Sequence, residues 1–261
     1  MSMPKADIPF HDHPDQFSES EWRSRLECAA GHHLLEHYKL TDMVEGVLAV
    51  RVEGEADAYL LKTYRTFFDE VRASDLVKVR FDETPDEGPG RPLNYSSCAQ
   101  AKGVLAVREN VNCMLHTHIP AATVVASLEG GLQAVIQHAL IVYNEIVYVD
   151  LDIGNDDTAV ADIVRLMGDR KIAMIRNHGV FVVGSTVAEV LFLTITLEYA
   201  CRCQLDARQS GEKVLALDAA DAARMSQEFT SDANNQMAFN GSLQWPGWLR
   251  KLDRMGSCYR E

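Results

Sequence analysis

The segment that most constrains the fold is an apolar run ending in two histidines and a proline, from Val111 to Pro120. Side chains alternate between the two faces of a β-strand, so His116 and His118 point to one side and Thr117 to the other. Two neutral imidazoles at the end of a strand can chelate a divalent metal ion. They can equally be surface or hydrogen-bonded histidines, and the pair alone leaves both interpretations open.

Composition limits the partners that the chain can take. It has 261 residues, with 38 acidic against 25 basic side chains and a net charge of −13. This charge disfavours nucleic acid or an anionic membrane as a partner. The six cysteines form no C-x-x-C pair, and no stretch reaches the roughly 18 apolar residues that a membrane span needs. We therefore expect reduced thiols and a cytoplasmic protein.

Hydrophobic periodicity predicts a mixture of helices and strands without strict alternation. This order favours an α/β fold with three layers, α/β/α, over a Rossmann fold, and no glycine-rich phosphate fingerprint follows a strand. We expect a flexible tail over 1–20 and one domain over 21–261 that includes a C-terminal helical arm. Within it the pattern predicts helices at 22–40, 96–107, 121–128, 158–167 and 187–207, and strands at 47–52, 58–61, 76–81, 111–118, 141–149, 171–175 and 180–183.

His178 also follows an apolar strand, in R-N-H-G-V. The ordered set H-T-H-I-P-A-A, Q-H-A-L, R-N-H-G-V, L-E-Y-A-C-R-C-Q-L and a terminal W-x-x-x-L-R-K-L-D-R-x-x-x-x-Y-R resembles the class II aldolase/adducin family. The resemblance runs from about Arg23 to Arg260. It implies a three-layer domain with a central, mostly antiparallel sheet, and a homotetramer with sites at the subunit interfaces.

The resemblance also assigns a metal centre. His116, His118 and His178 match the three metal ligands of the family. Three neutral histidines leave coordination positions open, as in a catalytic site. We expect one divalent ion per subunit, with zinc favoured over iron, manganese or cobalt, acting as a Lewis acid.

Two departures from the family concern the substrate. Ser97 stands where the sugar-phosphate aldolases carry an acid/base glutamate, and a serine cannot replace a carboxylate as proton acceptor near neutral pH. The phosphate-binding loops are altered too, and one of them now contains Lys62 and Arg65. We expect Lys62, Arg65 and Ser97 to contact the substrate, with the two cations binding a small anion such as a carboxylate. The alternative is that the two cations face solvent or pair with nearby acids.

Three further residues have two interpretations each. His138, in Q-H-A-L, is a candidate proton donor, and Tyr259 matches a family tyrosine that closes over a site. Each could instead be a packed or hydrogen-bonded residue. Glu198, in the long helix, is expected to form a structural ion pair or hydrogen bond.

The leading hypothesis is a metal-dependent carbon–carbon lyase, either a decarboxylase or an aldolase-type enzyme. Its substrate would be a small carbonyl or phenolic compound that carries a carboxylate. A non-haem iron oxygenase on the same three histidines is the first alternative. The second is a non-catalytic, oligomeric binding protein of the adducin branch, which also lacks the glutamate.

Overall fold

The structure is a computed structural model that describes residues 14–83, 92–150, 157–231 and 239–261. Its centre is a seven-stranded sheet in the order β3-β2-β1-β4-β7-β6-β5. Neighbouring strands are antiparallel except for β5 and β6, which are parallel. The strands are β1 (Val47–Arg51), β2 (Ala58–Leu61), β3 (Val77–Arg80), β4 (Cys113–Thr117), β5 (Ile146–Val149), β6 (Ile172–Ile175) and β7 (Gly179–Gly184).

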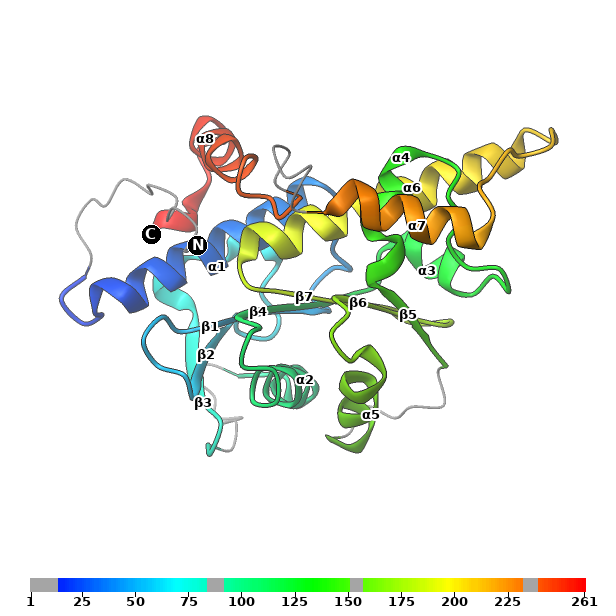
Figure 1. Ribbon diagram of the computed structural model, residues 1–261. Coiled ribbons are helices and arrows are strands. Elements are labelled where there is room, and N and C mark those ends of the chain that lie inside the picture. Colours follow the sequence, from blue (N-terminus) through cyan, green and yellow to red (C-terminus); the bar gives the residue numbers. More distant parts are fainter. Residues whose placement is uncertain (1–13, 84–91, 151–156, 232–238) are drawn as a thin grey trace.

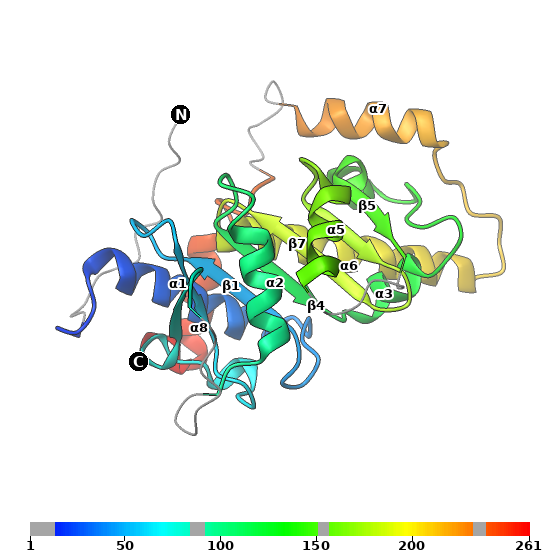
Figure 2. The ribbon, with the colours of Figure 1, turned by 90° about the horizontal axis from the view of Figure 1, so that it is seen from below.

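Helices cover both faces of this sheet and complete three layers, as Figure 1 shows. α2 (Tyr95–Leu105) and α5 (Asp157–Met167) lie side by side on one face (Figure 2). The other face carries α1 (Glu19–His37), α3 (Pro120–Ala126), α4 (Gln137–Val142), α6 (Val187–Gln209), α7 (Ala219–Thr230) and α8 (Trp245–Met255). The predicted three-layer, mostly antiparallel α/β fold is confirmed.

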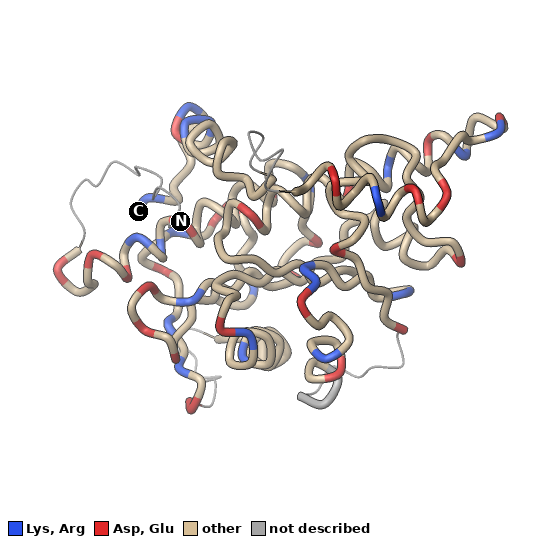
Figure 3. Tube along the Cα trace, viewed as in Figure 1, with Lys and Arg blue, Asp and Glu red and all other residues tan. Residues whose placement is uncertain are grey.

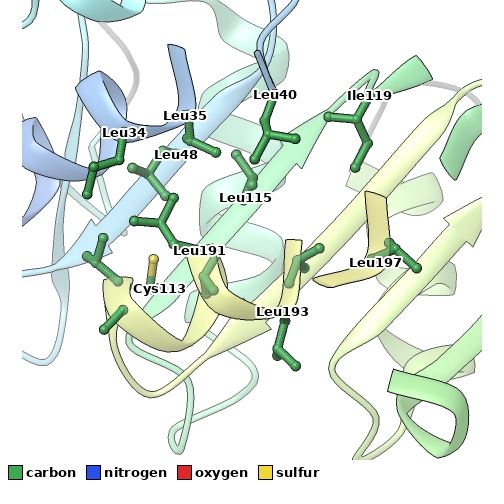
Figure 4. Packing of buried hydrophobic residues seen from close by; sticks show 14 of the residues in the cluster. Leu34, Leu35, Leu40, Leu48, Cys113, Leu115, Ile119, Leu191, Leu193 and Leu197 are labelled. Atoms are coloured by element: carbon green, nitrogen blue, oxygen red, sulfur yellow. The ribbon is translucent and has the colours of Figure 1, made fainter. Parts of the chain in front are cut away.

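The central strand β4 explains why the core has two halves. All five of its residues are buried, and alternate side chains enter opposite layers. Leu115 packs in the cluster beneath α1 and α6, whereas Met114 packs in the cluster formed with α2 and α5. Figure 4 shows Leu34 of α1, Leu48 of β1 and Leu115 of β4 in the first of these two clusters. The apolar run before the histidines is therefore buried on both faces.

One predicted strand is wrong over its first half. The segment expected to be a strand over 141–149 begins with the end of α4 and a 3₁₀ turn at Tyr143–Glu145, and only β5 is extended. α4 buries its apolar side chains against α6 and α7. A short continuous apolar run cannot be assigned to helix or strand by period alone, which accounts for the error.

The two ends of the chain meet α1. Ser18 caps α1, and Phe17 stacks on Trp22. At the other end, the indole of Trp248 in α8 donates a hydrogen bond to the hydroxyl of Tyr38. Residues 1–13 of the expected tail lie outside the described part, so the predicted domain boundary at residue 20 stays a prediction.

The described surface carries acidic and basic residues interspersed on most elements (Figure 3). No helix in the described part of the chain is both long and apolar enough to cross a membrane.

Candidate metal centre

The sheet brings the three predicted ligands together. His116 lies near the end of β4, and His118 follows that strand. His178 comes directly before β7, which pairs with β4 in the antiparallel sense and places its start beside the end of β4. Each of the three histidines offers a ring nitrogen, and these atoms all lie within 4.8 Å of one another.

Hydrogen bonds fix two of the rings. Nδ1 of His116 lies 3.0 Å from the carbonyl oxygen of Val180, and Nδ1 of His118 lies 2.9 Å from a carboxylate oxygen of Asp42. Donation from Nδ1 leaves the lone pair on Nε2, the tautomer that binds metal. Nε2 of His118 is buried and has no hydrogen-bond partner among the described residues.

Burial favours the neutral form of His116 and of His178. It lowers the pKa of His116 to about 3, with further contributions from His118 and His178. The pKa of His178 is lowered by burial and by the neighbouring His118. Metal ligation requires the neutral imidazole, so these groups need lose no proton near pH 7. The donor set, the fixed tautomers and the unpartnered nitrogen fit a divalent metal ion.

Two glycines allow the backbone to pack closely behind the histidines. A Cβ on Gly179 would lie 2.6 Å from the carbonyl oxygen of Thr117 and 2.8 Å from the His118 ring. A Cβ on Gly46, whose φ is +88°, would lie 2.8 Å from the carbonyl oxygen of His116. Any side chain at either position would displace the histidine segment.

Ser97 lies at the start of α2 and lines a small cavity with Gly46 and Asn94. The cavity measures about 10 Å³, which is room for about one water molecule. The described residues that line it include no Asp or Glu. No carboxylate side chain is therefore among the described residues that share this cavity with Ser97.

The two predicted cations are not brought together. Lys62 is buried and donates hydrogen bonds to the carbonyl oxygens of Val44 and Thr66, at 2.8 and 3.0 Å. Its ammonium lies 5.1 Å from the centre of the Phe68 ring, and burial lowers its pKa to about 8. Arg65 is exposed, with a φ of 73°. Lys62 thus joins two loops, and a role in substrate binding stays a prediction for both residues.

His138, the predicted proton donor, and Tyr259, the tyrosine predicted to close over a site, lie elsewhere in the subunit. His138 is exposed at the start of α4, with its ring 4.7 Å from that of Tyr199. Tyr259 is completely buried, and its hydroxyl lies 3.2 Å from a carboxylate oxygen of Asp253. Burial raises the pKa of this phenol. In the described contacts of one subunit neither residue meets the histidine cluster.

Sequence reasoning missed Asp42. It lies 76 residues before His118 in the chain, and only the pairing of β1 with β4 brings its loop to the cluster. Nothing in the local sequence marks this aspartate as a partner of a histidine.

A second and larger cavity lies at the other end of the same strands. It measures about 1,020 Å³ and is lined by residues that include Val52, Asn112, Ser185 and Trp245. None of the three histidines lines it. Among the described residues only the histidine end brings together the groups for a metal centre, so we place the candidate site there despite its smaller space.

Comparison with known proteins agrees with this geometry. A protein of Caulobacter vibrioides assigned to the class 2 aldolases is 32% identical over 249 residues, which cover 94% of each chain. The structure of an aldolase II superfamily protein from Pseudomonas syringae has a TM-score of 0.84 at 28% identity, covering 95% of this chain and 98% of that one. Adducin-related protein 1 of Caenorhabditis elegans is 26% identical over 95% of this chain, which spans 35% of that protein.

The family model of the class II aldolase and adducin N-terminal domain matches residues 26–205. This range contains β1 to β7 and all three histidines of the cluster. The chain belongs to the class II aldolase and adducin family.

Proposed function

We propose that this protein is a metal-dependent lyase that breaks a carbon–carbon bond in a small carbonyl or phenolic compound bearing a carboxylate. The three-histidine cluster carries the proposal, because three protein ligands leave open positions for a substrate. Nε2 of His116, Nε2 of His118 and the ring of His178 would hold one divalent ion, with zinc before iron, manganese or cobalt. The ion would supply Lewis-acid stabilisation of the negative charge that develops on a substrate oxygen.

Serine in place of a carboxylate at position 97 favours decarboxylation over retro-aldol cleavage. Retro-aldol cleavage begins with the removal of a hydroxyl proton, and Ser97 cannot accept that proton near neutral pH. In decarboxylation the electron pair of the bond to the carboxylate moves into the adjacent carbonyl system as carbon dioxide leaves. A proton is needed only afterwards, and water can supply it. The small cavity beside Ser97, which the described lining leaves without a carboxylate, supports this choice.

Assembly would bring further groups to the site. We propose a cytoplasmic homotetramer with sites between subunits, and neither nucleic acid nor membrane as a partner. In such an assembly the exposed His138 and Arg65 could reach a neighbouring subunit's site, as proton donor and carboxylate ligand respectively. Tyr259 has the contacts of a packing residue, since its ring is buried and its hydroxyl is hydrogen-bonded to Asp253.

The test combines metal content with product detection. The protein is purified anaerobically without a histidine tag, its metal is measured by mass spectrometry, and small 3-keto and hydroxybenzoic acids are screened for release of carbon dioxide. The controls are His178→Ala, which removes a ligand, and His37→Ala, which removes a histidine of α1 outside the cluster. Stoichiometric metal and product in wild type and His37→Ala, both lost in His178→Ala, are expected.

Two other outcomes would replace the proposal. The adducin relatives are a specific reason to consider a binding protein: Adducin-related protein 1 matches almost the whole of this chain. Wild-type protein without bound metal, and with no turnover of any compound, would favour that alternative. Iron-dependent oxygen consumption that tracks turnover would instead identify the non-haem iron oxygenase.

A further inference from the structure

The short helix α3 starts two residues after His118, and its N-terminus has no local cap. Ile119 occupies the capping position, and its side chain makes no capping hydrogen bond. The first backbone N–H groups of a helix have no partner within the helix and need an acceptor from elsewhere when they are buried. The acceptor in this protein comes from another helix, about 76 residues later in the chain.

Glu198 of α6 supplies that acceptor with both of its oxygens. Oε1 lies 3.1 Å from the backbone nitrogen of Ala121, and Oε2 lies 2.9 Å from that of Ala122. The carboxylate is buried, with 7% of its side chain exposed, and Arg202 also donates to Oε1. A carboxylate at a helix N-terminus is favoured by the helix dipole as well as by the hydrogen bonds.

The backbone on the other side of His118 is held in a similar way. The hydroxyl of Thr117 donates a 2.7 Å hydrogen bond to the carbonyl oxygen of Leu40. His118 is therefore flanked by two anchors that both come from distant segments. Its ring is held in turn by Asp42, which fixes the orientation of the ring but not the place of the backbone.

The C-terminal end of α3 meets the turn that carries His178. The guanidinium of Arg176 donates to the carbonyl oxygens of Ala126 and Leu128, at 2.8 and 3.1 Å. The backbone nitrogen of Asn177 donates to the hydroxyl of Ser127 at 2.8 Å. α3 thus spans the distance between His118 at one end and the His178 turn at the other.

We propose that Glu198 is a positioning residue of the metal centre: it anchors α3 and thereby fixes His118 relative to His178. This inference rests on the proposed metal centre. Glu198 touches no ligand ring in the described structure and acts through the backbone of α3. Displacement of α3 would separate ring nitrogens that now lie within 4.8 Å of one another.

Glu198→Gln tests this with almost no change in shape. The amide keeps one acceptor oxygen but turns an NH₂ group towards the second backbone N–H, which loses its partner. The matched control is Arg202→Gln, which removes the exposed partner of Glu198 and leaves both hydrogen bonds to α3 intact. Circular dichroism and gel filtration would establish that both variants are folded and assembled like wild type.

Zinc affinity, measured by competition with a chromogenic chelator, is the first readout. Loss of a supporting partner of a metal ligand lowers affinity about 10- to 100-fold, and we expect about tenfold for Glu198→Gln because it acts indirectly. The absorption spectrum of the cobalt-substituted variant should shift, which a general loss of stability would not produce. Arg202→Gln should match wild type in both measurements. Wild-type affinity and an unchanged spectrum in folded Glu198→Gln would overturn the proposal.

Hydrogen exchange of the metal-free proteins is the second readout, and it does not depend on metal binding. Glu198→Gln should exchange its amide hydrogens faster than wild type at residues 118–128 and 176–179. Exchange in the strands of the sheet outside these segments should be unchanged. Exchange that rises evenly over the whole core, or not at all, would contradict the positioning role. If wild-type protein binds no divalent metal ion, the proposed function fails, and exchange confined to these two segments still supports the role of Glu198 in placing the histidines.

Discussion

The histidines of α1 and those of the candidate metal centre differ in the contacts of their second ring nitrogen. His33, on α1, has both ring nitrogens occupied, by the hydroxyl of Ser257 at 2.8 Å and by the carbonyl oxygen of Val71 at 2.9 Å. His116 has one ring nitrogen occupied by a backbone carbonyl, and its other nitrogen faces two further histidines. Burial lowers the pKa in both groups. Neither burial nor a lowered pKa therefore identifies a metal ligand.

His32 sharpens the comparison. Its Nδ1 lies 2.8 Å from the carbonyl oxygen of Cys28, and its Nε2 has no hydrogen-bond partner in the described part of the chain. This resembles His118, but the His32 ring packs against Phe68, and among the described residues His32 belongs to no group of three possible metal ligands. A metal centre is distinguished by several spare nitrogens that converge on one point.

The largest expected effect separates the two groups directly. His178→Ala should abolish metal binding, because only two of the three ligands remain. The loss of metal affinity should be well beyond the roughly 100-fold that removal of a supporting partner costs. His33→Ala should bind metal as wild type does. Metal content after dialysis and titration calorimetry check both. Equal loss of metal in the two variants would mean that the convergence of the three histidine nitrogens does not define the metal site.

Asp42→Asn should lower metal affinity by about 10- to 100-fold, because the amide can no longer accept the proton on His118 Nδ1 as a charged partner does. The same titration checks it. Glu45→Gln is the control, since Glu45 lies in the same loop but accepts from the hydroxyl of Tyr64. An affinity that falls equally in both variants would indicate a disturbed loop instead of a lost partner of His118.

The α1 histidines should affect stability instead. His33→Ala leaves the carbonyl of Val71 without its imidazole partner, removes one of the hydrogen bonds of the Ser257 hydroxyl and opens a cavity, at a cost of about 2 kcal/mol or more. His32→Leu should cost less than about 1 kcal/mol, since it also removes the unpaired Nε2. Urea unfolding at pH 7 of the metal-free proteins measures both. A larger loss for His32→Leu than for His33→Ala would reverse this order.

The last expected effect is on the pH dependence of stability. Burial lowers the pKa of His32 from 6.5 to about 3. Between these values the unfolded chain takes up a proton that the folded chain does not, so the stability contributed by neutral His32 is full above pH 6.5 and is lost as the pH falls towards 3. His32→Leu should make the fall in stability over this range shallower than in wild type, as urea unfolding at pH 7 and 4.5 would show. Parallel slopes would exclude this contribution.

Much of the fold follows from sequence patterns, and so does the histidine set. The apolar run in 111–118 predicted β4, and the periodicity of 187–207 predicted most of α6. The three histidines were identified because each follows an apolar strand within a recognised set of motifs. The error at 141–149 arose where a short apolar run satisfies a helix and a strand equally well.

The residues that hold the histidines in place were harder to predict from the sequence, because they act through contacts between distant segments. Asp42 reaches His118 only through the pairing of β1 with β4. Glu198 was expected to make a structural hydrogen bond or ion pair, and it makes both, but its partners at the start of α3 could not be named from the sequence. Lys62 was predicted to bind substrate from its charge, and that stays a prediction: it lines the same small cavity as Ser97, but the sequence could not show the two carbonyls to which it donates.

The pairing of β4 with β7 joins His116 to a segment 64 residues away. An unfolded chain cannot present the three imidazoles together, so a metal ion that binds the native cluster draws the folding equilibrium towards the native state. At a free metal concentration of 100 times the dissociation constant, this linkage adds about 2.7 kcal/mol to the free energy of unfolding. The difference in melting temperature with and without metal would therefore report on whether β4 and β7 pair as described, even before any substrate is known.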